Sequence, residues 1–224
     1  MHFIAEIVMP PVADVEKAVG QVLAQFDENT NERNGFWDWW VIGGRMAGGK
    51  TIASLDKDKI AAFNKELSER KVTVSGIQWG KQELSPAYQI PMVDGLWGEF
   101  FPELAGTPCP MFLHSNDNRS PLPQDICAVS QVPPAYEFER IIVAMPGMMH
   151  DDEYNELGEG MVAQWMLQTS FWNGLTHVDA KWDGTWAQAL AMHTDYVNHF
   201  YKEEFRASKM IQPNWISVTV DYHS

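Results

Sequence analysis

The chain has few cysteines and no long hydrophobic run. Its two cysteines, Cys109 and Cys127, are too few for a disulfide scaffold, so we expect both to be reduced thiols. No run of 18 apolar residues occurs, which argues against a transmembrane helix and against a membrane partner. The first residues lack the basic region and cleavage site of a signal peptide. The sequence therefore predicts a cytoplasmic protein.

Basic residues are also scarce. The 224 residues include 16 Lys and Arg against 30 Asp and Glu, which gives a formal net charge of −14. A phosphate backbone repels such a chain, so we do not expect direct nucleic-acid binding. The acidic residues are scattered rather than gathered in one block, which favours a role in solubility. The alternative is an acidic surface that binds a basic partner.

Several catalytic signatures are absent. We expect no P-loop, because residues 48–51 (Gly-Gly-Lys-Thr) are taken as the end of its pattern without a strand-to-helix context. A nucleophile elbow, a His-Glu-x-x-His motif, a dinucleotide fingerprint and a metal-binding cysteine spacing do not occur either. The sequence thus predicts no metal site and names no cofactor, and it leaves open whether the protein is an enzyme.

Residues 36–45, Phe-Trp-Asp-Trp-Trp-Val-Ile-Gly-Gly-Arg, form the most distinctive stretch. Their aromatic and β-branched side chains predict a strand that ends in a turn at Gly43 and Gly44. Strand alternation gives two faces, one with Phe36, Asp38, Trp40 and Ile42 and the other with Trp37, Trp39 and Val41. A carboxylate among apolar neighbours needs a partner or a shifted pKa, and Arg45 is the nearest cation in the sequence.

This stretch has two interpretations. In the functional one, Trp37, Trp39 and Arg45 bind a planar or anionic ligand, because arginine suits carboxylates and phosphates and tryptophan suits rings or cations. Gly43 and Gly44 would then let the ligand approach closely. In the structural one, the stretch is a core strand, Asp38 and Arg45 form an ion pair, and the glycines only make a turn.

Two further polar groups are candidates for the same site. Glu28 belongs to a polar run at residues 27–32, which is otherwise a solvated helix exit. Asp221 and His223 lie on one face of the last predicted strand, about 7 Å apart along it. A carboxylate and an imidazole so placed suit an acid–base pair or a metal, although two residues are only half of such a site.

Three segments resemble a group of uncharacterised proteins from tailed-phage genomes. They are Asp27-Glu28-Asn29, Trp37 to Arg45, and Val220-Asp221-Tyr222-His223. In that group a tryptophan often follows the arginine, whereas Met46 stands there in this chain. The resemblance covers the two ends of the chain. It implies a phage origin, a host-cell cytoplasmic location and a shared site, but no named activity.

Hydrophobic periodicity predicts an α+β fold in one domain, residues 1–224. We expect a mainly antiparallel sheet with helices packed on one face, and with the first and last strands as neighbours. Proline-rich residues 83–124 predict a long irregular insertion, with a short strand at 87–93. The expected strands are 2–9, 36–42, 71–79, 125–132, 138–145 and 215–223, and the expected helices are 14–26, 56–69, 150–168 and 183–205.

Three functions fit these observations. The leading one is binding of a small nucleotide-like or anionic ligand by Trp37, Trp39 and Arg45, with Asp221 and His223, as in the capture of a host defence signal. The second is a phosphoester or nucleotide hydrolase that uses Glu28, Asp38, Asp221 and His223. The third is an acidic protein that inhibits a host enzyme by direct contact. A host protein partner and a homo-oligomer stay open.

Overall fold

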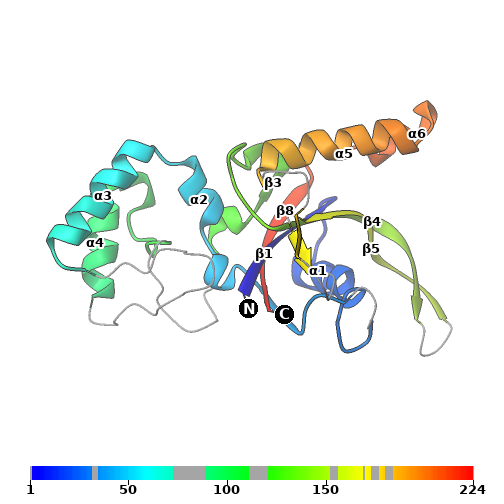
Figure 1. Cartoon of the computed structure of the whole chain (residues 1–224), viewed down its shortest axis with the longest axis horizontal. Helices are drawn as coiled ribbons and strands as arrows, with labels where there is room; N and C mark the ends of the chain where they lie inside the picture. The colour runs from blue at the N-terminus through cyan, green and yellow to red at the C-terminus, as the bar shows by residue number, and fades with distance from the viewer. Residues whose placement is uncertain are drawn as a thin grey trace.

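The computed structural model describes residues 2–31, 35–72, 89–110, 121–151, 156–168, 170–172, 177–179 and 184–223 (Figure 1). Its strands are β1 (His2–Met9), β2 (Trp39–Ile42), β3 (Ile126–Ala128), β4 (Arg140–Asp151), β5 (Glu156–Gln168), β6 (Ser170–Trp172), β7 (His177–Asp179) and β8 (Ile216–His223). Its α-helices are α1 (Val15–Ala24), α2 (Gly49–Ser54), α3 (Lys57–Glu69), α4 (Ile90–Phe100), α5 (Trp186–Phe200) and α6 (Glu203–Lys209). Short 3-10 turns are η1 (Gly44–Met46), η2 (Pro102–Leu104), η3 (Pro123–Asp125) and η4 (Val129–Gln131).

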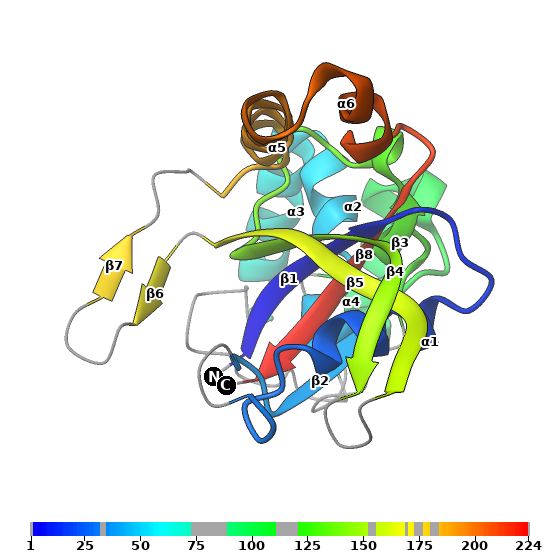
Figure 2. The same ribbon diagram turned by 90° about the vertical axis from the view of Figure 1, so that its right-hand side faces the viewer.

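One six-stranded sheet organises the molecule around β8. The strand order is β2-β8-β1-β4-β5, and β3 also pairs with β8. All these pairs are antiparallel except β1 with β4. The expected α+β class and mainly antiparallel sheet are therefore confirmed, and the first and last strands are indeed neighbours (Figure 2).

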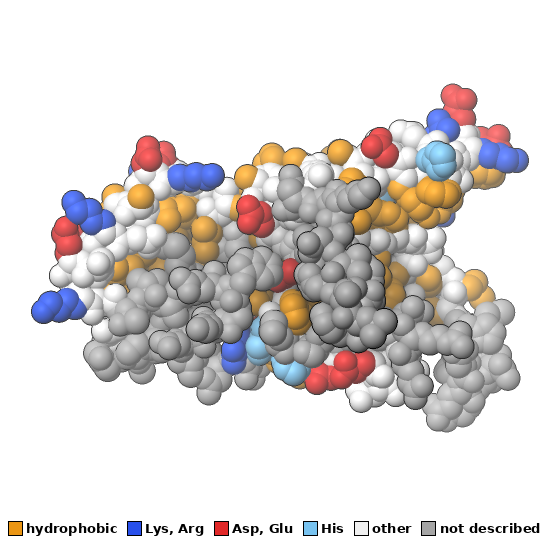
Figure 3. Space-filling view, in the orientation of Figure 1, with side chains coloured by type: hydrophobic (Ala, Val, Ile, Leu, Met, Phe, Trp, Pro, Cys, Tyr) orange, Lys and Arg blue, Asp and Glu red, His pale blue; other side chains and the backbone are white. Residues whose placement is uncertain are grey.

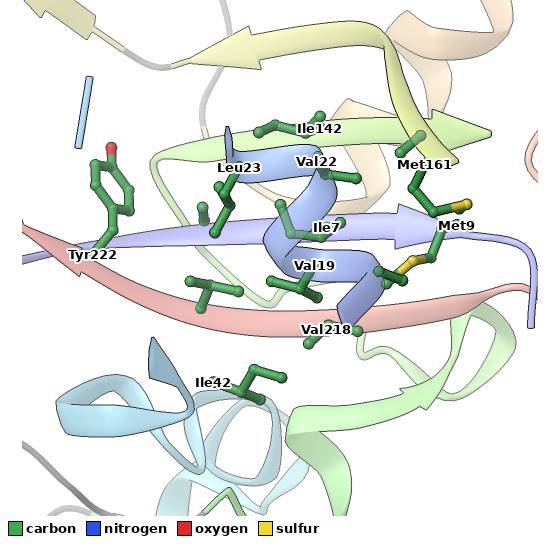
Figure 4. Packing of buried hydrophobic residues seen from close by; sticks show 14 residues of the cluster. Ile7, Met9, Val19, Val22, Leu23, Ile42, Ile142, Met161, Val218 and Tyr222 are labelled. Atoms are coloured by element: carbon green, nitrogen blue, oxygen red, sulfur yellow. The ribbon is translucent and has the colours of Figure 1, made fainter. Parts of the chain in front are cut away.

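Helices lie against both faces of this sheet rather than on one. Side chains on β1 alternate between the two faces, which explains why both are apolar enough to be covered. On one face Ile7 packs in a buried cluster with Val19 and Val22 of α1 (Figure 4). On the other face Ile141 of β4 belongs to a cluster that includes Trp186 of α5.

The predicted irregular insertion contains a helix. α3 and α4 pack together away from the sheet (Figure 1), around Phe63, Leu67, Val93, Leu96, Trp97 and Phe101. The predicted strand at 87–93 is wrong over residues 90–93, which open α4. Pro91 lies in the first turn of the helix, where the missing N–H costs nothing. Residues 83–88 and 111–120 lie outside the described residues.

The helix expected at 150–168 is also wrong. β4 and β5 form a long hairpin in which Asp151 pairs with Glu156. Gly158 and Gly160 lie in β5, and a glycine in a helix interior costs about 1 kcal/mol relative to alanine, which disfavours a helix there. Of the predicted strand at 71–79, residues 71 and 72 are not in a strand and residues 73–79 lie outside the described part of the chain.

Three smaller expectations concern the cysteines, membrane-spanning helices and the helix at 183–205. No disulfide joins Cys109 and Cys127, and both are buried. Among the described residues, none of the helices has the length and apolar character needed to cross a bilayer. The predicted helix at 183–205 is divided into α5 and α6, with an extended backbone at Tyr201 and Lys202 between them.

Candidate functional site

Strands β2, β8 and β1 bring three rings into one row. His223 of β8 is paired with His2 of β1 on one side and with Trp39 of β2 on the other. Residues opposite one another on adjacent strands share a face. The His2 ring centroid lies 5.6 Å from that of His223 and 5.8 Å from that of Trp39, in edge-on contacts. Histidine side chains gather at the surface near the labelled chain ends (Figures 1 and 3).

A carboxylate holds each of the two histidines. Asp221 Oδ1 lies 2.8 Å from Nδ1 of His2, and Asp38 Oδ1 lies 2.8 Å from Nδ1 of His223. Asp221 is fully buried, whereas Asp38 and His223 are both exposed to solvent. A carboxylate at Nδ1 orients the ring and determines the proton position at Nε2. The strand ends thus present two oriented imidazoles side by side.

The glycine turn after β2 allows the backbone to close on Asp221. Gly43 and Gly44 have φ angles of 76° and 55°, a region that favours glycine. A Cβ on Gly44 would lie 2.6 Å from Asp221 Oδ2. That oxygen accepts a hydrogen bond of 2.8 Å from the backbone N–H of Arg45. The Gly-Gly pair is therefore required for the contact between the turn and the buried carboxylate.

Burial and hydrogen bonding act in opposite directions on Asp221. Burial raises the pKa of this carboxyl, while the hydrogen bonds from Arg45 and His2, and the positive charges of these two residues, lower it. The half-buried Arg45 side chain therefore lies close enough to act on the Asp221 carboxylate. The site combines a cation and two anchored imidazoles.

Glu139, just before β4, adds a carboxyl on the same side. Its Oε2 accepts a hydrogen bond of 2.7 Å from the backbone N–H of Ile4. Burial raises the pKa of Glu139 to about 7, the hydrogen bond from Ile4 lowers it, and the charge of Asp221 raises it further. A carboxyl that titrates near neutral pH suits a general acid or base.

A buried ionic network lies behind this row on the same face of the sheet. Lys50 Nζ of α2 lies 2.9 Å from Glu6 Oε2 of β1, and both side chains are fully buried. The Glu6 carboxylate also accepts hydrogen bonds from the hydroxyls of Ser217, Thr219 and Tyr136. Residues 44–51 have the Gly-x-x-x-x-Gly-Lys-Thr spacing of a P-loop and lie between strand β2 and helix α2, so the expected lack of a strand-to-helix context is wrong. Lys50 is nevertheless held in the interior by Glu6 and ties α2 to the sheet just beyond the glycine turn.

The nine residues expected in the site fall into two groups. Seven are brought together: Asp38, Trp39, Gly43, Gly44, Arg45, Asp221 and His223. Trp37 packs against the cluster beneath α1, and its Nε1–H donates to the carbonyl oxygen of Leu23 at 2.7 Å. The exposed Glu28 donates its backbone N–H to the carbonyl oxygen of Trp37. These two residues shape the entry into β2 rather than the row of rings.

The structural interpretation pairs Asp38 with Arg45, whereas the contact found for the Asp38 carboxylate among the described residues is with His223. β2 begins at Trp39, so Asp38 precedes the strand and is not bound by its alternation. Its carboxylate contacts His223 instead, on the side where Trp39 lies. Asp38 therefore orients an exposed imidazole.

Sequence reasoning missed His2, Glu139 and the Glu6–Lys50 pair. Pairing the first and last strands in antiparallel register would have placed His2 opposite His223, so that signal was present. Nothing in the sequence around Glu139 indicated that it would be buried. Among the described residues, no three His, Cys, Asp or Glu side chains converge to form a metal site.

No protein-family model, curated protein or solved structure matches the chain. A function for the row of rings therefore has to be argued from its geometry and charge.

Proposed function

We propose that the row of His2, His223 and Trp39, together with Arg45, binds a small nucleotide-like or anionic ligand. The observation that carries the proposal is the pair of imidazoles anchored by carboxylates beside an indole, with ring centroids less than 6 Å apart. Oriented imidazole and guanidinium groups suit phosphate oxygens, and an indole suits a planar base.

The groups at the site favour binding of a small anion, although the net charge of the chain is negative. A net charge of −14 disfavours long polyanions, but the charge of Arg45 lies beside Asp221, so a single phosphate meets a local cation. The exposed His223 is accessible to such a ligand, since 43% of its side chain is exposed. The class expected is thus a mononucleotide or a similar small anion rather than a nucleic acid.

Calorimetric titration with adenosine monophosphate, adenosine and ribose 5-phosphate tests the proposal. We expect the monophosphate to bind more tightly than either fragment. Arg45→Ala and His223→Gln should each weaken it roughly 10- to 150-fold, which is the usual effect of losing a charged hydrogen bond. His199→Gln, at an exposed histidine of α5, is the matched control and should bind like wild type.

The stability of the variants separates a binding role from a structural one. Arg45→Ala should change the free energy of unfolding by no more than about 1 kcal/mol. If unfolding accompanies the loss of binding, Arg45 is structural. Equal binding of the monophosphate and adenosine, or no binding of any of the three compounds, would refute the proposal.

The second candidate function is hydrolysis of a phosphoester, which the two adjacent His–Asp pairs favour. One imidazole would take a proton from the attacking water while the other gives a proton to the leaving oxygen as the P–O bond breaks. Release of 4-nitrophenolate from bis(4-nitrophenyl) phosphate would report this reaction. His2→Gln and His223→Gln should each slow it at least about 100-fold, whereas equal rates would exclude both histidines as the acid and base.

The biological setting rests on the resemblance to tailed-phage proteins. In that setting, a protein that binds a host nucleotide signal would sequester it and blunt a defence response. Native mass spectrometry of protein purified from bacterial cells tests this step. A co-purifying nucleotide would support it. If no nucleotide co-purifies and a host protein binds instead, with an affinity that falls as the salt concentration rises, the inhibitor function is favoured.

A further inference from the structure

A cavity lies at the other end of β8 from the row of rings. It has a volume of about 460 Å³, within the range usual for small-molecule sites. Its wall is formed by α5, by η4 and by the segment that leads into β8, and includes Val132, Trp186, Leu190, Ile211 and Pro213. Strand geometry places it roughly 20 Å from His223, so the two sites do not overlap.

His193 lies in this mainly apolar wall, together with the smaller polar residues Ser130 and Thr194. Its side chain lines the cavity and is only 3% exposed. The Trp165 ring contacts it edge-on, with ring centroids 5.1 Å apart. The sequence predicts a packed, hydrogen-bonded core histidine. It is packed, but within the described residues neither of its ring nitrogens forms a hydrogen bond.

Neither nitrogen of His193 is among the fully buried polar atoms that lack a partner, so the ring edge reaches the open space of the cavity, where a ligand can contact it. Burial lowers the pKa of His193 to about 4, so the ring is neutral at physiological pH. A neutral imidazole offers one N–H donor and one nitrogen acceptor. The mainly apolar surroundings disfavour a charged ligand, because a charge without a partner is costly to bury.

We propose that this cavity binds an uncharged, mainly apolar ring compound that forms a hydrogen bond with His193. The apolar wall would hold the body of the compound, and the imidazole would fix its orientation. This inference does not depend on the function proposed for the row of rings. It assigns the protein a second ligand of a different chemical class, one without phosphate.

Two bicyclic probes of nearly the same shape test the proposal. Benzimidazole carries both a donor and an acceptor nitrogen and is uncharged at pH 8, whereas indene is the corresponding hydrocarbon. We expect benzimidazole to bind about fivefold more tightly than indene, the effect of one neutral hydrogen bond. NMR titration should shift backbone signals of Ala187, Leu190 and Thr194, which line the cavity, and should leave His223 unchanged.

The wild-type protein also provides a direct readout of the hydrogen bond. Benzimidazole should move the side-chain ¹⁵N resonances of His193, and indene should not. His193→Phe should weaken benzimidazole about fivefold and leave indene within twofold. Ala187→Trp, at an exposed position on the rim, should block both probes without disturbing the core.

Three results would overturn the proposal. The first is equal affinity for the two probes in the wild-type protein. The second is a benzimidazole titration that shifts no cavity signals up to several millimolar. The third is binding that leaves the His193 nitrogen resonances unmoved.

Discussion

Replacing Lys50 with methionine would remove the ammonium group that contacts the fully buried carboxylate of Glu6. The Lys50–Glu6 pair has an N–O distance of 2.9 Å, and neither side chain is exposed. Methionine keeps the length of the aliphatic chain and is a good helix former, so the helix around position 50 should persist. The change therefore isolates the charge and the hydrogen bonds of the ammonium group.

The expected cost is large because one charge would stay buried alone. Removing one partner of a buried ion pair typically costs about 3–5 kcal/mol, whereas removing both charges is often close to neutral. Lys50 Nζ also contacts the carbonyl oxygens of Ser217 and Asp125, at 3.2 and 3.4 Å. A domain of this size is stable by only about 5–15 kcal/mol, so Lys50→Met should remove a substantial part of its stability.

Urea denaturation followed by circular dichroism at pH 7 measures the effect. We expect Glu6→Gln/Lys50→Met to recover more than half of the stability lost in Lys50→Met, because no charge is then left unpaired. Lys65→Met is the control, since Lys65 and Glu69 form an exposed pair 3.7 Å apart, and it should cost no more than about 0.5 kcal/mol. The reasoning fails if Lys50→Met lies within 1 kcal/mol of wild type, or if the double variant is the less stable of the two.

Four shorter predictions concern single positions. Gly44→Ala should destabilise the fold by about 1–3 kcal/mol in urea denaturation and abolish nucleotide binding, because of its positive φ and the clash with Asp221. Trp37→Phe should cost about 1 kcal/mol, for the lost hydrogen bond to Leu23, and leave nucleotide affinity unchanged in calorimetry. The pKa of Glu139 is about 7 in the folded state against an ordinary 4.5, so its contribution to stability should be lost as pH rises from 4.5 to 7. Glu139→Gln should flatten that part of a plot of unfolding free energy against pH. The pKa of His193 is about 4 against an ordinary 6.5, so stability should be lost as pH falls from 6.5 to 4, a decline that His193→Phe should remove from the same plot.

Local periodicity predicted most strands of the sheet, and it was most successful near the two ends of the chain. β1, α1, α3 and β8 formed where alternation or helical spacing was strong. β1 and β8 were expected as neighbours, and the structure pairs them in antiparallel register. The β4–β5 hairpin was missed because acidic residues at 151–153 also suit the first turn of a helix, and Met161 and Trp165 also match a helical stripe. Tertiary pairing decided between these patterns.

The candidate site was predictable where its residues lie on one strand, and not where strands meet. Asp221 and His223 were placed on one face by alternation, as the structure shows. Trp37 could not be distinguished from Trp39 by residue type, because both suit a core and a ligand site equally well. Only the position where β2 begins separates them, and this depends on the loop before it. The partners of Asp38 and Lys50 depend on contacts over more than 40 residues, which no local pattern encodes.

The central position of β8 has a consequence for the biosynthesis of this protein. β8 pairs with β1, β2 and β3, all of which leave the ribosome earlier than it does. Until residues 216–223 have emerged, β1 lacks its β8 neighbour, β2 and β3 lack the strand that joins them to the sheet, and Glu6 lacks two of its hydroxyl partners. Such long-range pairing slows folding and leaves strand edges exposed meanwhile. The nascent chain thus exposes unpaired strand edges until β8 has been made, and the row of rings forms only once residue 223 has joined the sheet.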